Sequence, residues 1–416
     1  MDFISIIIYI SIYIGLVATS FYILSYRDNI KKERKFFSEE ELPKISVLIP
    51  AYNEEKSIVQ TIESICKSDY PKEKFEIIVI DDGSKDKTYN IAKKFESEKF
   101  PKIMVLHKEN GGKGTALNLG ISKASGEIIF TMDADTYVDS QSMRRMIHSF
   151  TNPRVMAVTA AMLVYKPRTI WQRIQHMEYL LGIFLRKSLA TLNAVYITPG
   201  AFSAYRTEFF KKYGGYDEKN ITEDIELSLR IQYNGYFIDN CPTAPVWTIA
   251  PSTFKGLFMQ RRRWYFGFLK NIVKYEKIIS KKYGDLGLFV IPVGLIATFF
   301  SIFLTVYLFF KSISEVSKEF LFYQSVNFDF SNAFHFNYLV FQRFFFNLFT
   351  NPIVLFILLF FSMIGFYIYY ASKNVGKFSG IIVDLSLFFI FFAALYGFWW
   401  TVSIFYTIFS KKVKWR

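Results

Sequence analysis

The sequence predicts an α/β domain with a mostly parallel sheet, flanked by transmembrane and interfacial α-helices. Over residues 43–250, short β-branched runs alternate with amphipathic helical patterns, which is typical of βαβ units. Long apolar runs stand on both sides of this region, and 51% of the 416 residues are hydrophobic, with 47 phenylalanines. A soluble domain rarely carries that much phenylalanine, so membrane-spanning segments are expected.

The apolar run at residues 3–24 is long enough for one bilayer crossing. A signal peptide is disfavoured, because no basic segment precedes the run and no small-residue cleavage site follows it. Five basic residues come directly after it: Arg27, Lys31, Lys32, Arg34 and Lys35. By the positive-inside rule we expect Met1 outside, the next domain in the cytosol, and a multi-pass protein of the cell membrane.

Three further apolar runs, at 286–310, at 352–370 and within 380–409, predict additional crossings. Three crossings would leave the C-terminus outside. The basic tail favours the inside, with Lys411, Lys412, Lys414 and Arg416. Two resolutions stay open: a break at Tyr396-Gly397 that splits the last run, or a dip of residues 335–349 into the membrane.

The chain therefore divides into four expected parts. They are an N-terminal transmembrane helix at 1–26, the soluble domain at 43–250, amphipathic interfacial helices at 251–284 and a C-terminal transmembrane region at 285–416. The formal net charge of +14 concentrates beside the apolar runs. This placement favours membrane lipids and anionic substrates over nucleic acid. The two cysteines, Cys66 and Cys241, and the four scattered histidines match no zinc-site spacing.

Within the soluble domain the patterns predict alternating strands and helices. The strands are 45–49, 76–80, 103–107 and 127–132, and the helices are 55–67, 86–97, 114–123 and 223–234. Ligands of such sheets bind outside the carboxyl ends of the strands. Polar clusters stand at those ends in this sequence, so we expect them to meet along one edge.

Three of these clusters are acidic. The first strand runs into Tyr52-Asn53-Glu54, the second into Asp81-Asp82-Gly83-Ser84, and the fourth into Asp133-Ala134-Asp135. Two carboxylates two residues apart suit Mg²⁺ or Mn²⁺, although a solvated turn is an equally common explanation. In the second cluster, Ser84 is the expected N-cap of the next helix, and one aspartate is left to bind a base or a ribose.

Three other motifs carry charge or stacking surface. The bend 110–114 offers backbone amides and Lys113 to an anion. Thr222-Glu223-Asp224 opens a helix, with Thr222 as the expected N-cap and a carboxylate available as a general base. Gln260, Arg263 and Trp264 share one helical face, where arginine can pair with a diphosphate and tryptophan can stack on a sugar. The competing explanation of this last segment is a headgroup-binding interfacial helix.

In this order and spacing, the motifs resemble the family-two processive inverting glycosyltransferases, which are the membrane synthases of poly-N-acetylglucosamine, chitin, hyaluronan and cellulose. The resemblance spans nearly the whole chain. It implies a GT-A-type nucleotide-sugar-binding domain with a cytosolic catalytic site and a Mg²⁺ or Mn²⁺ cofactor. It also implies elongation of a β-linked polysaccharide from a UDP-linked sugar, with UDP-N-acetylglucosamine as the expected donor.

The resemblance also implies residue roles. Asp224 is the catalytic base, with Glu223 beside it. The donor nucleotide is bound by Tyr52, Glu54, Asp81, Asp82, Lys113 and Asp133. Asp135, with Asp133, binds the metal. Diphosphate and acceptor are held by Gln260, Arg263 and Trp264, and the segment 198–202 lies near the acceptor. Arg261 and Arg262 have no catalytic meaning in this comparison, and the Phe-rich loop 311–350 matches nothing in the family.

Other functions remain open. A non-processive enzyme would add one sugar to a polyprenyl phosphate or lipid with the same donor site. A non-enzymatic membrane-anchored sugar-binding protein would have no use for four carboxylates in a cleft. A nucleotidyltransferase would not need Thr-Glu-Asp followed by Gln-x-x-Arg-Trp. The expected partners are the nucleotide sugar, a glycan or lipid acceptor and membrane lipids, with a homo-oligomer or an accessory subunit to complete a glycan conduit.

Overall fold

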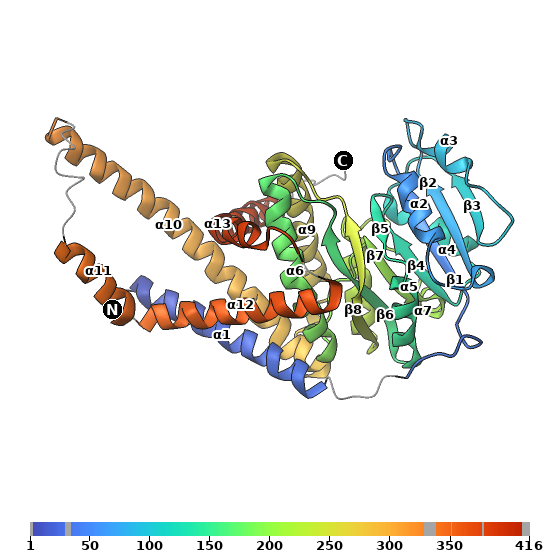
Figure 1. Cartoon of the computed structure of the whole chain (residues 1–416), viewed down its shortest axis with the longest axis horizontal. Helices are drawn as coiled ribbons and strands as arrows, with labels where there is room; N and C mark the ends of the chain where they lie inside the picture. Colours follow the sequence, from blue (N-terminus) through green and yellow to red (C-terminus); the bar gives the residue numbers. More distant parts are fainter. Residues whose placement is uncertain (1–2, 30–34, 328–337, 351, 377, 410–416) are drawn as a thin grey trace.

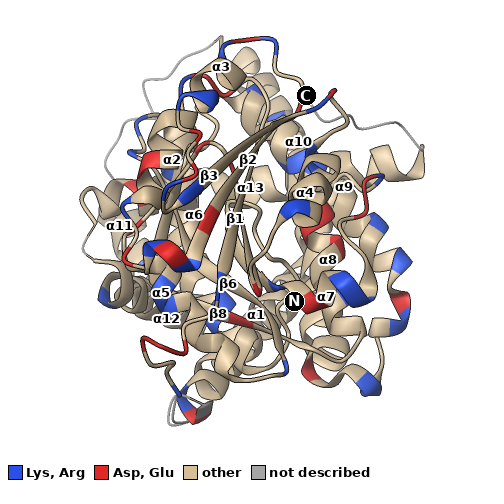
Figure 2. Cartoon of the chain, turned by 90° about the vertical axis from the view of Figure 1, so that its right-hand side faces the viewer, with Lys and Arg blue, Asp and Glu red and all other residues tan. Residues whose placement is uncertain are grey.

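An α/β domain and a group of long helices make up the chain (Figure 1). The computed structural model describes residues 3–29, 35–327, 338–350, 352–376 and 378–409. Several of the basic residues noted in the sequence analysis lie outside the described residues: Lys31, Lys32 and Arg34 after the first apolar run, and Lys411, Lys412, Lys414 and Arg416 in the tail. In Figure 2, which faces the α/β domain, basic and acidic residues alternate over the surface without a long tract of one sign.

An eight-stranded mixed sheet, in the order β3-β2-β1-β4-β7-β6-β8-β5, forms the centre of the domain. The strands are β1 (Ile45–Ala51), β2 (Phe75–Asp81), β3 (Lys102–His107), β4 (Ile128–Met132), β5 (Thr136–Val138), β6 (Val155–Val164), β7 (Phe202–Arg206) and β8 (Phe237–Thr248). Strands β3, β2, β1 and β4 are parallel, whereas β7 is antiparallel to β4 and β6. The four predicted strands are confirmed to within two residues at each end.

Helices cover both faces of the sheet, because its strands are apolar on both sides. Val47 and Ile49 of β1 pack toward α2 (Ile58–Cys66), α3 (Thr88–Lys93) and α5 (Ser142–Ile147). Leu48, between them, faces the opposite core with α4 (Lys113–Lys123), α7 (Thr207–Tyr213) and α8 (Glu223–Tyr233). This alternation of side chains is the period of two that strands impose.

Two predicted helices are shorter than expected, because their first residues form turns at the sheet edge instead. Helix α2 begins at Ile58 and not at residue 55, and α3 begins at Thr88 and not at residue 86. The prediction that Ser84 caps α3 is wrong. Its hydroxyl oxygen accepts a hydrogen bond from the Asn53 N–H at 2.9 Å, which ties the turn after β2 to the turn after β1.

Two amphipathic helices, α6 (Ile170–Thr191) and α9 (Phe254–Lys274), lie between the sheet and the long apolar helices (Figure 1). Helix α6 begins with a capping box, in which Thr169 and Gln172 each bond the other's backbone N–H. Thr253 is the N-cap of helix α9, and its hydroxyl oxygen accepts a hydrogen bond from the Gly256 N–H. The sequence analysis anticipated α9 but did not single out α6.

Among the described residues, four helices are long and apolar enough to cross a membrane: α1 (Phe3–Asn29), α10 (Ile291–Ser325), α12 (Pro352–Val375) and α13 (Ile381–Ile408). The expectation of a loop over 311–350 is wrong for its described parts. Helix α10 continues to Ser325, and α11 (Tyr338–Thr350) is helical as well. Residues 311–325 and 338–350 contain no proline or glycine that would end a helix.

The predicted break at Tyr396-Gly397 is also wrong, because α13 is one continuous helix. Gly397 lies directly against the Thr305 side chain of α10, so the glycine serves close helix packing there. Helix α13 packs against α6, α9 and α10. In Figure 1 it is seen nearly along its axis, whereas α12 runs across the view. The last apolar helix therefore has a different direction from its neighbours.

Candidate active site at the carboxyl edge of the sheet

A largely buried lysine joins the carboxylates at this edge. Lys113 opens α4, directly after Gly112, whose positive φ of 94° makes the bend into the helix. Its Nζ lies 2.5 Å from Asp133 Oδ1, at the end of β4, and 3.6 Å from Glu223 Oε1, at the start of α8. Residues more than 100 positions apart in the chain therefore meet around one ammonium group.

The electrostatics of Lys113 follow from this setting. Burial alone would lower the pKa of the ammonium group, but Asp133, Glu223 and Asp224 outweigh it and raise the pKa above its ordinary value. The lysine thus stays charged and compensates a site that is otherwise acidic.

Asp135 and Glu54 are further carboxylates of this charged cluster at the sheet edge. Burial raises the pKa of Asp135 to about 7, and the nearby carboxylates of Asp133 and Glu54 add to the rise. No group of three or more His, Cys, Asp or Glu side chains with metal-binding geometry occurs in the part of the chain that the structure describes. Two crowded carboxylates nevertheless fit Mg²⁺ or Mn²⁺, which take the rest of their ligands from water and phosphate oxygens.

The start of α8 supplies two further carboxylates. Glu223 is 3% exposed. Burial raises its pKa to about 7; Asp224 adds to the rise, whereas Lys113 and Arg263 oppose it. Asp224 is half-buried, and its Oδ1 accepts from the Ile225 N–H at 2.9 Å. Thr222 stands at the N-cap position as predicted, but its side chain does not cap the helix.

The hydroxyl of Thr222 is used elsewhere, and this explains the difference. It accepts a hydrogen bond from Asn271 Nδ2 of α9 at 3.0 Å. Gly267 of α9 also lies against the Thr222 side chain, leaving no room for a Cβ. Helix α9 is therefore docked directly onto the residue that precedes Glu223 and Asp224.

Asp81 and Asp82, at the end of β2, have different surroundings. Asp82 accepts from Lys108 Nζ at 2.6 Å, from the Gly111 N–H at 3.0 Å and from the Gly112 N–H at 2.8 Å, so it holds the glycine-rich bend before Lys113. Asp81 Oδ2 lies 2.7 Å from His107 Nδ1. Its Oδ1 is buried and has no hydrogen-bond donor among the described residues. Asp81 is therefore the aspartate with an unused acceptor, while Tyr52 is 39% exposed at the adjacent turn.

The segment 198–202 borders the same cleft. Gly200 lies against Lys113 Nζ, and a Cβ at this position would also stand 3.7 Å from Asp133 Oδ1. Thr198 Oγ1 donates to the backbone oxygen of Asp224 at 3.2 Å. A side chain at position 200 would therefore displace the Lys113 ammonium group from its present place.

Helix α9 brings its motif residues to the cleft unequally. Arg263 acts electrostatically on Glu223, which places it at the cleft. Trp264 packs against the core cluster of the sheet. Gln260 Oε1 is buried without a hydrogen-bond donor in the described part of the chain, and no interaction of Gln260 with the charged cluster is found there.

The sequence analysis missed Arg261 as a structural residue. Arg261 is 2% exposed and donates two hydrogen bonds of 2.7 Å to the two carboxylate oxygens of Glu178 on α6. Its guanidinium also lies 4.4 Å from the Trp264 ring and 5.6 Å from the Trp399 ring of α13. Removing one partner of such a buried pair costs about 3–5 kcal/mol. Only its position three residues before Trp264, on the same helical face, hinted at this contact.

Arg262 makes a related contact. Its Nη1 donates to the hydroxyl of Tyr406 at 3.1 Å, which is a second link between α9 and α13. Arg261 and Arg262, to which the resemblance assigned no catalytic role, therefore hold α9 against α6 and α13.

Comparison with known families identifies the domain. Residues 46–214 match the family described as "Glycosyl transferase family 2". The resemblance drawn from the motifs is thereby confirmed at the level of the domain.

Two curated relatives extend the match beyond the domain. The chain is 32% identical over 275 residues to the "Probable glycosyltransferase YdaM" of Bacillus subtilis (strain 168), covering 62% of this chain and 64% of that protein. It is 35% identical over 262 residues to "Poly-beta-1,6-N-acetyl-D-glucosamine synthase" of Staphylococcus aureus (strain COL), covering 58% and 62%. The match thus spans less than two thirds of the length of these relatives.

A solved structure shares the fold. "Mannosyltransferase PcManGT from Pyrobaculum calidifontis in complex with GDP-Man and Mn2+" superposes with a TM-score of 0.59 at 17% sequence identity, and covers 98% of this chain and 100% of that one. At this identity the likeness concerns the fold alone. The α/β domain has the GT-A fold, with a mostly parallel mixed sheet, and apolar helices flank it as predicted.

Proposed function

We propose that this chain, whose residues 46–214 form a glycosyl transferase family 2 domain, transfers a sugar from a nucleotide sugar to a glycan at the membrane, with inversion at the anomeric carbon. The observation that carries the proposal is the meeting of Asp133, Glu223 and Lys113 in one charged cluster at the carboxyl edge of the sheet. A cation between carboxylates is suited to a substrate that carries both phosphates and hydroxyls.

The donor nucleotide lies along the ends of β1 and β2 in this proposal. Asp81 has an unused buried oxygen for a base or ribose hydroxyl, with Tyr52 and Glu54 beside it, while Asp82 shapes the bend that presents Lys113. Lys113 and Arg263 receive the diphosphate. UDP-N-acetylglucosamine is the donor we propose, because relatives at 35% identity are named as synthases of poly-N-acetylglucosamine.

Asp133 and Asp135 hold the divalent cation. When bound, Mg²⁺ or Mn²⁺ would neutralise charge on the departing nucleotide diphosphate. The carboxylates fit this role because Asp135 is destabilised as an anion by burial and by Asp133 and Glu54, and a nearby cation relieves that repulsion.

Asp224 is the proposed general base. The Ile225 N–H fixes its Oδ1, while Oδ2 has no hydrogen-bond donor among the described residues and is available to the acceptor hydroxyl. The hydroxyl oxygen attacks the anomeric carbon, its proton passes to Asp224, and the bond to the diphosphate breaks on the opposite face. One base without a second, nucleophilic carboxylate implies inversion, so an α-linked donor gives a β-linked product.

A donor screen on the purified protein in lipid tests the function. With UDP-N-acetylglucosamine and Mn²⁺ we expect released UDP together with a polymer on a sizing column. A single-sugar lipid product would establish instead the non-processive function. Absence of nucleotide release with UDP- and GDP-sugars, with or without Mn²⁺, would reject the enzymatic proposal in favour of a sugar-binding protein.

Replacement of Asp224→Asn tests the assigned base. The amide keeps the size of the side chain but cannot accept the acceptor proton, so we expect turnover to fall about 10²-fold or more with donor affinity largely kept. Initial rates and nucleotide binding measured on the same preparation separate the two effects. Asp217→Asn is a matched control, since that carboxylate pairs with Lys274 outside the cleft; near-normal turnover in Asp224→Asn would refute the assignment.

We also propose a membrane orientation, with the α/β domain in the cytosol. Helices α1, α10 and α12 cross the membrane, while α13 lies along the domain-facing side and leaves the basic tail in the cytosol. Contacts of the C-terminal part of α12 and the N-terminal part of α13 with the domain support this arrangement. Tyr370 of α12 packs in a cluster with α6, and Asp384 of α13 bonds to His176 of α6. It satisfies the positive-inside rule at both ends of the chain.

Single-cysteine labelling in right-side-out vesicles tests this orientation, with Cys66 and Cys241 replaced by serine. An impermeant maleimide should label Asn332→Cys, between α10 and α11, from outside. Ser38→Cys and Lys412→Cys should react only after permeabilisation. External labelling of Lys412→Cys would mean that α13 crosses the membrane.

A further inference from the structure

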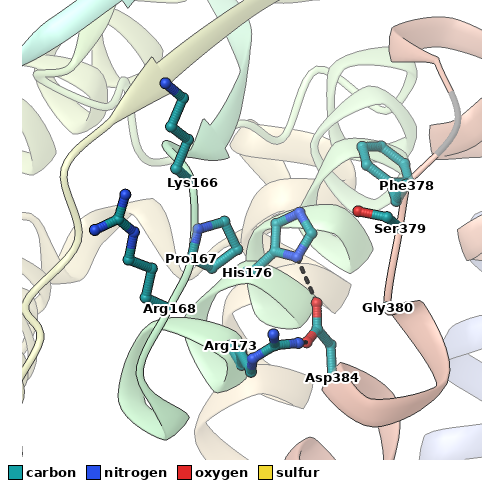
Figure 3. A pocket seen from close by; sticks show the side chains of 9 residues that line it. All are labelled: Lys166, Pro167, Arg168, Arg173, His176, Phe378, Ser379, Gly380 and Asp384. Atoms are coloured by element: carbon teal, nitrogen blue, oxygen red, sulfur yellow. Dashed lines mark hydrogen bonds and ion pairs between the residues drawn. The ribbon is translucent and has the colours of Figure 1, made fainter.

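A second, basic cavity lies at the junction between the α/β domain and the membrane helices. Its volume is about 540 Å³. It is lined by the loop after β6, by α6 and by the link between α12 and α13: Lys166, Pro167, Arg168, Arg173, His176, Phe378, Ser379, Gly380 and Asp384 (Figure 3). None of these residues belongs to the candidate active site.

The one carboxylate in this cavity is already satisfied. Asp384, 1% exposed, accepts from Arg173 Nη1 at 2.9 Å through Oδ1, and its Oδ2 lies 2.7 Å from His176 Nδ1. Figure 3 shows both partners reaching Asp384 from α6. Both carboxylate oxygens of Asp384 thus have hydrogen-bond partners, and these two contacts hold the start of α13 against α6.

The cations in the cavity are in excess. Lys166 and Arg168 are exposed and have no carboxylate partner in the described part of the chain. Three basic side chains, Lys166, Arg168 and Arg173, therefore surround one carboxylate, so the lining carries more positive than negative charge. Such a surplus in a concave site favours an anionic ligand.

The backbone adds to this preference. Helix α13 begins after Gly380, which has a φ of 72° and provides no side-chain cap, so the first N–H groups of the helix are left for another acceptor. A helix N-terminus and neighbouring arginines together suit the oxygens of a phosphate group.

We propose that this cavity binds a phosphate group, supplied by the headgroup of an anionic phospholipid or by a soluble phosphate. The site lies where α12 ends at Val375 and α13 begins at Ile381, the ends of two long apolar helices, and Phe378 places an aromatic ring at its rim. A phosphate bound there would contact both the loop after β6 and the start of α13, and would link these two segments. It is independent of the donor and acceptor chemistry of the cleft.

The test uses the full-length protein in a non-ionic detergent and two probes, dioctanoyl phosphatidylglycerol and inorganic phosphate. We expect saturable binding of at least one probe in calorimetric titration, and a loss of affinity of at least about tenfold in the double variant Lys166→Ser/Arg168→Ser. These two exposed residues leave the contacts of Asp384 intact, so thermal unfolding should confirm a folded variant. Lys281→Ser/Lys282→Ser is the matched control, because it removes equal charge from another exposed basic pair.

The probes distinguish the source of the phosphate. Binding of the lipid alone assigns the site to a headgroup, whereas binding of inorganic phosphate with the same dependence on Lys166 and Arg168 assigns it to a soluble ligand; both results support the proposal. Equal affinities in the parent and the Lys166→Ser/Arg168→Ser variant, or no binding of either probe, would overturn it. Neither probe tests sugar transfer, so failure here leaves the proposed function standing.

Discussion

The charge of Lys113 is the constraint on which the cleft depends. Asp133, Glu223 and Asp224 come from β4 and α8, and each raises the pKa of this lysine. Without the ammonium group these carboxylates would repel one another in a partly dry site, where isolated charges are strongly disfavoured. Gly200 leaves space for the lysine ammonium group, and Asp82 holds the bend that precedes Lys113. The acidic site is thus folded around one cation, Lys113, and in the proposed function Asp135 helps to bind a second one.

The same cleft is tied to the membrane part of the chain through α9. On one side, Asn271 and Gly267 dock α9 against Thr222, next to the proposed base. On the other side, Arg261 joins Glu178 of α6 and stands near Trp399 of α13. One helix therefore carries contacts to the catalytic edge and to the apolar helices.

Much of this architecture could be predicted from the sequence, where signals are local. Strand periodicity located β1 to β4 to within two residues, and the motif order identified the domain family. The hydrogen bonds of the turns were harder to predict. Serine is a common helix N-cap, yet the Ser84 hydroxyl accepts a hydrogen bond from the Asn53 N–H of the neighbouring turn. The loop expected over 311–350 is helical wherever the structure describes it, since aromatic density hid the helical period. Arg261, Glu178 and the cavity around Asp384 depend on contacts between distant segments, which no local pattern encodes.

Nucleotide binding by Lys113→Met tests the central claim most directly. The account predicts that calorimetry with UDP and Mn²⁺ shows affinity reduced by about tenfold or more, because a charge-assisted contact to the diphosphate is lost and three carboxylates lose their counter-charge. Lys123→Met, at the exposed end of the same helix, should bind as the parent does. Unchanged UDP affinity in a folded Lys113→Met protein would mean that the diphosphate lies elsewhere, and would contradict the account.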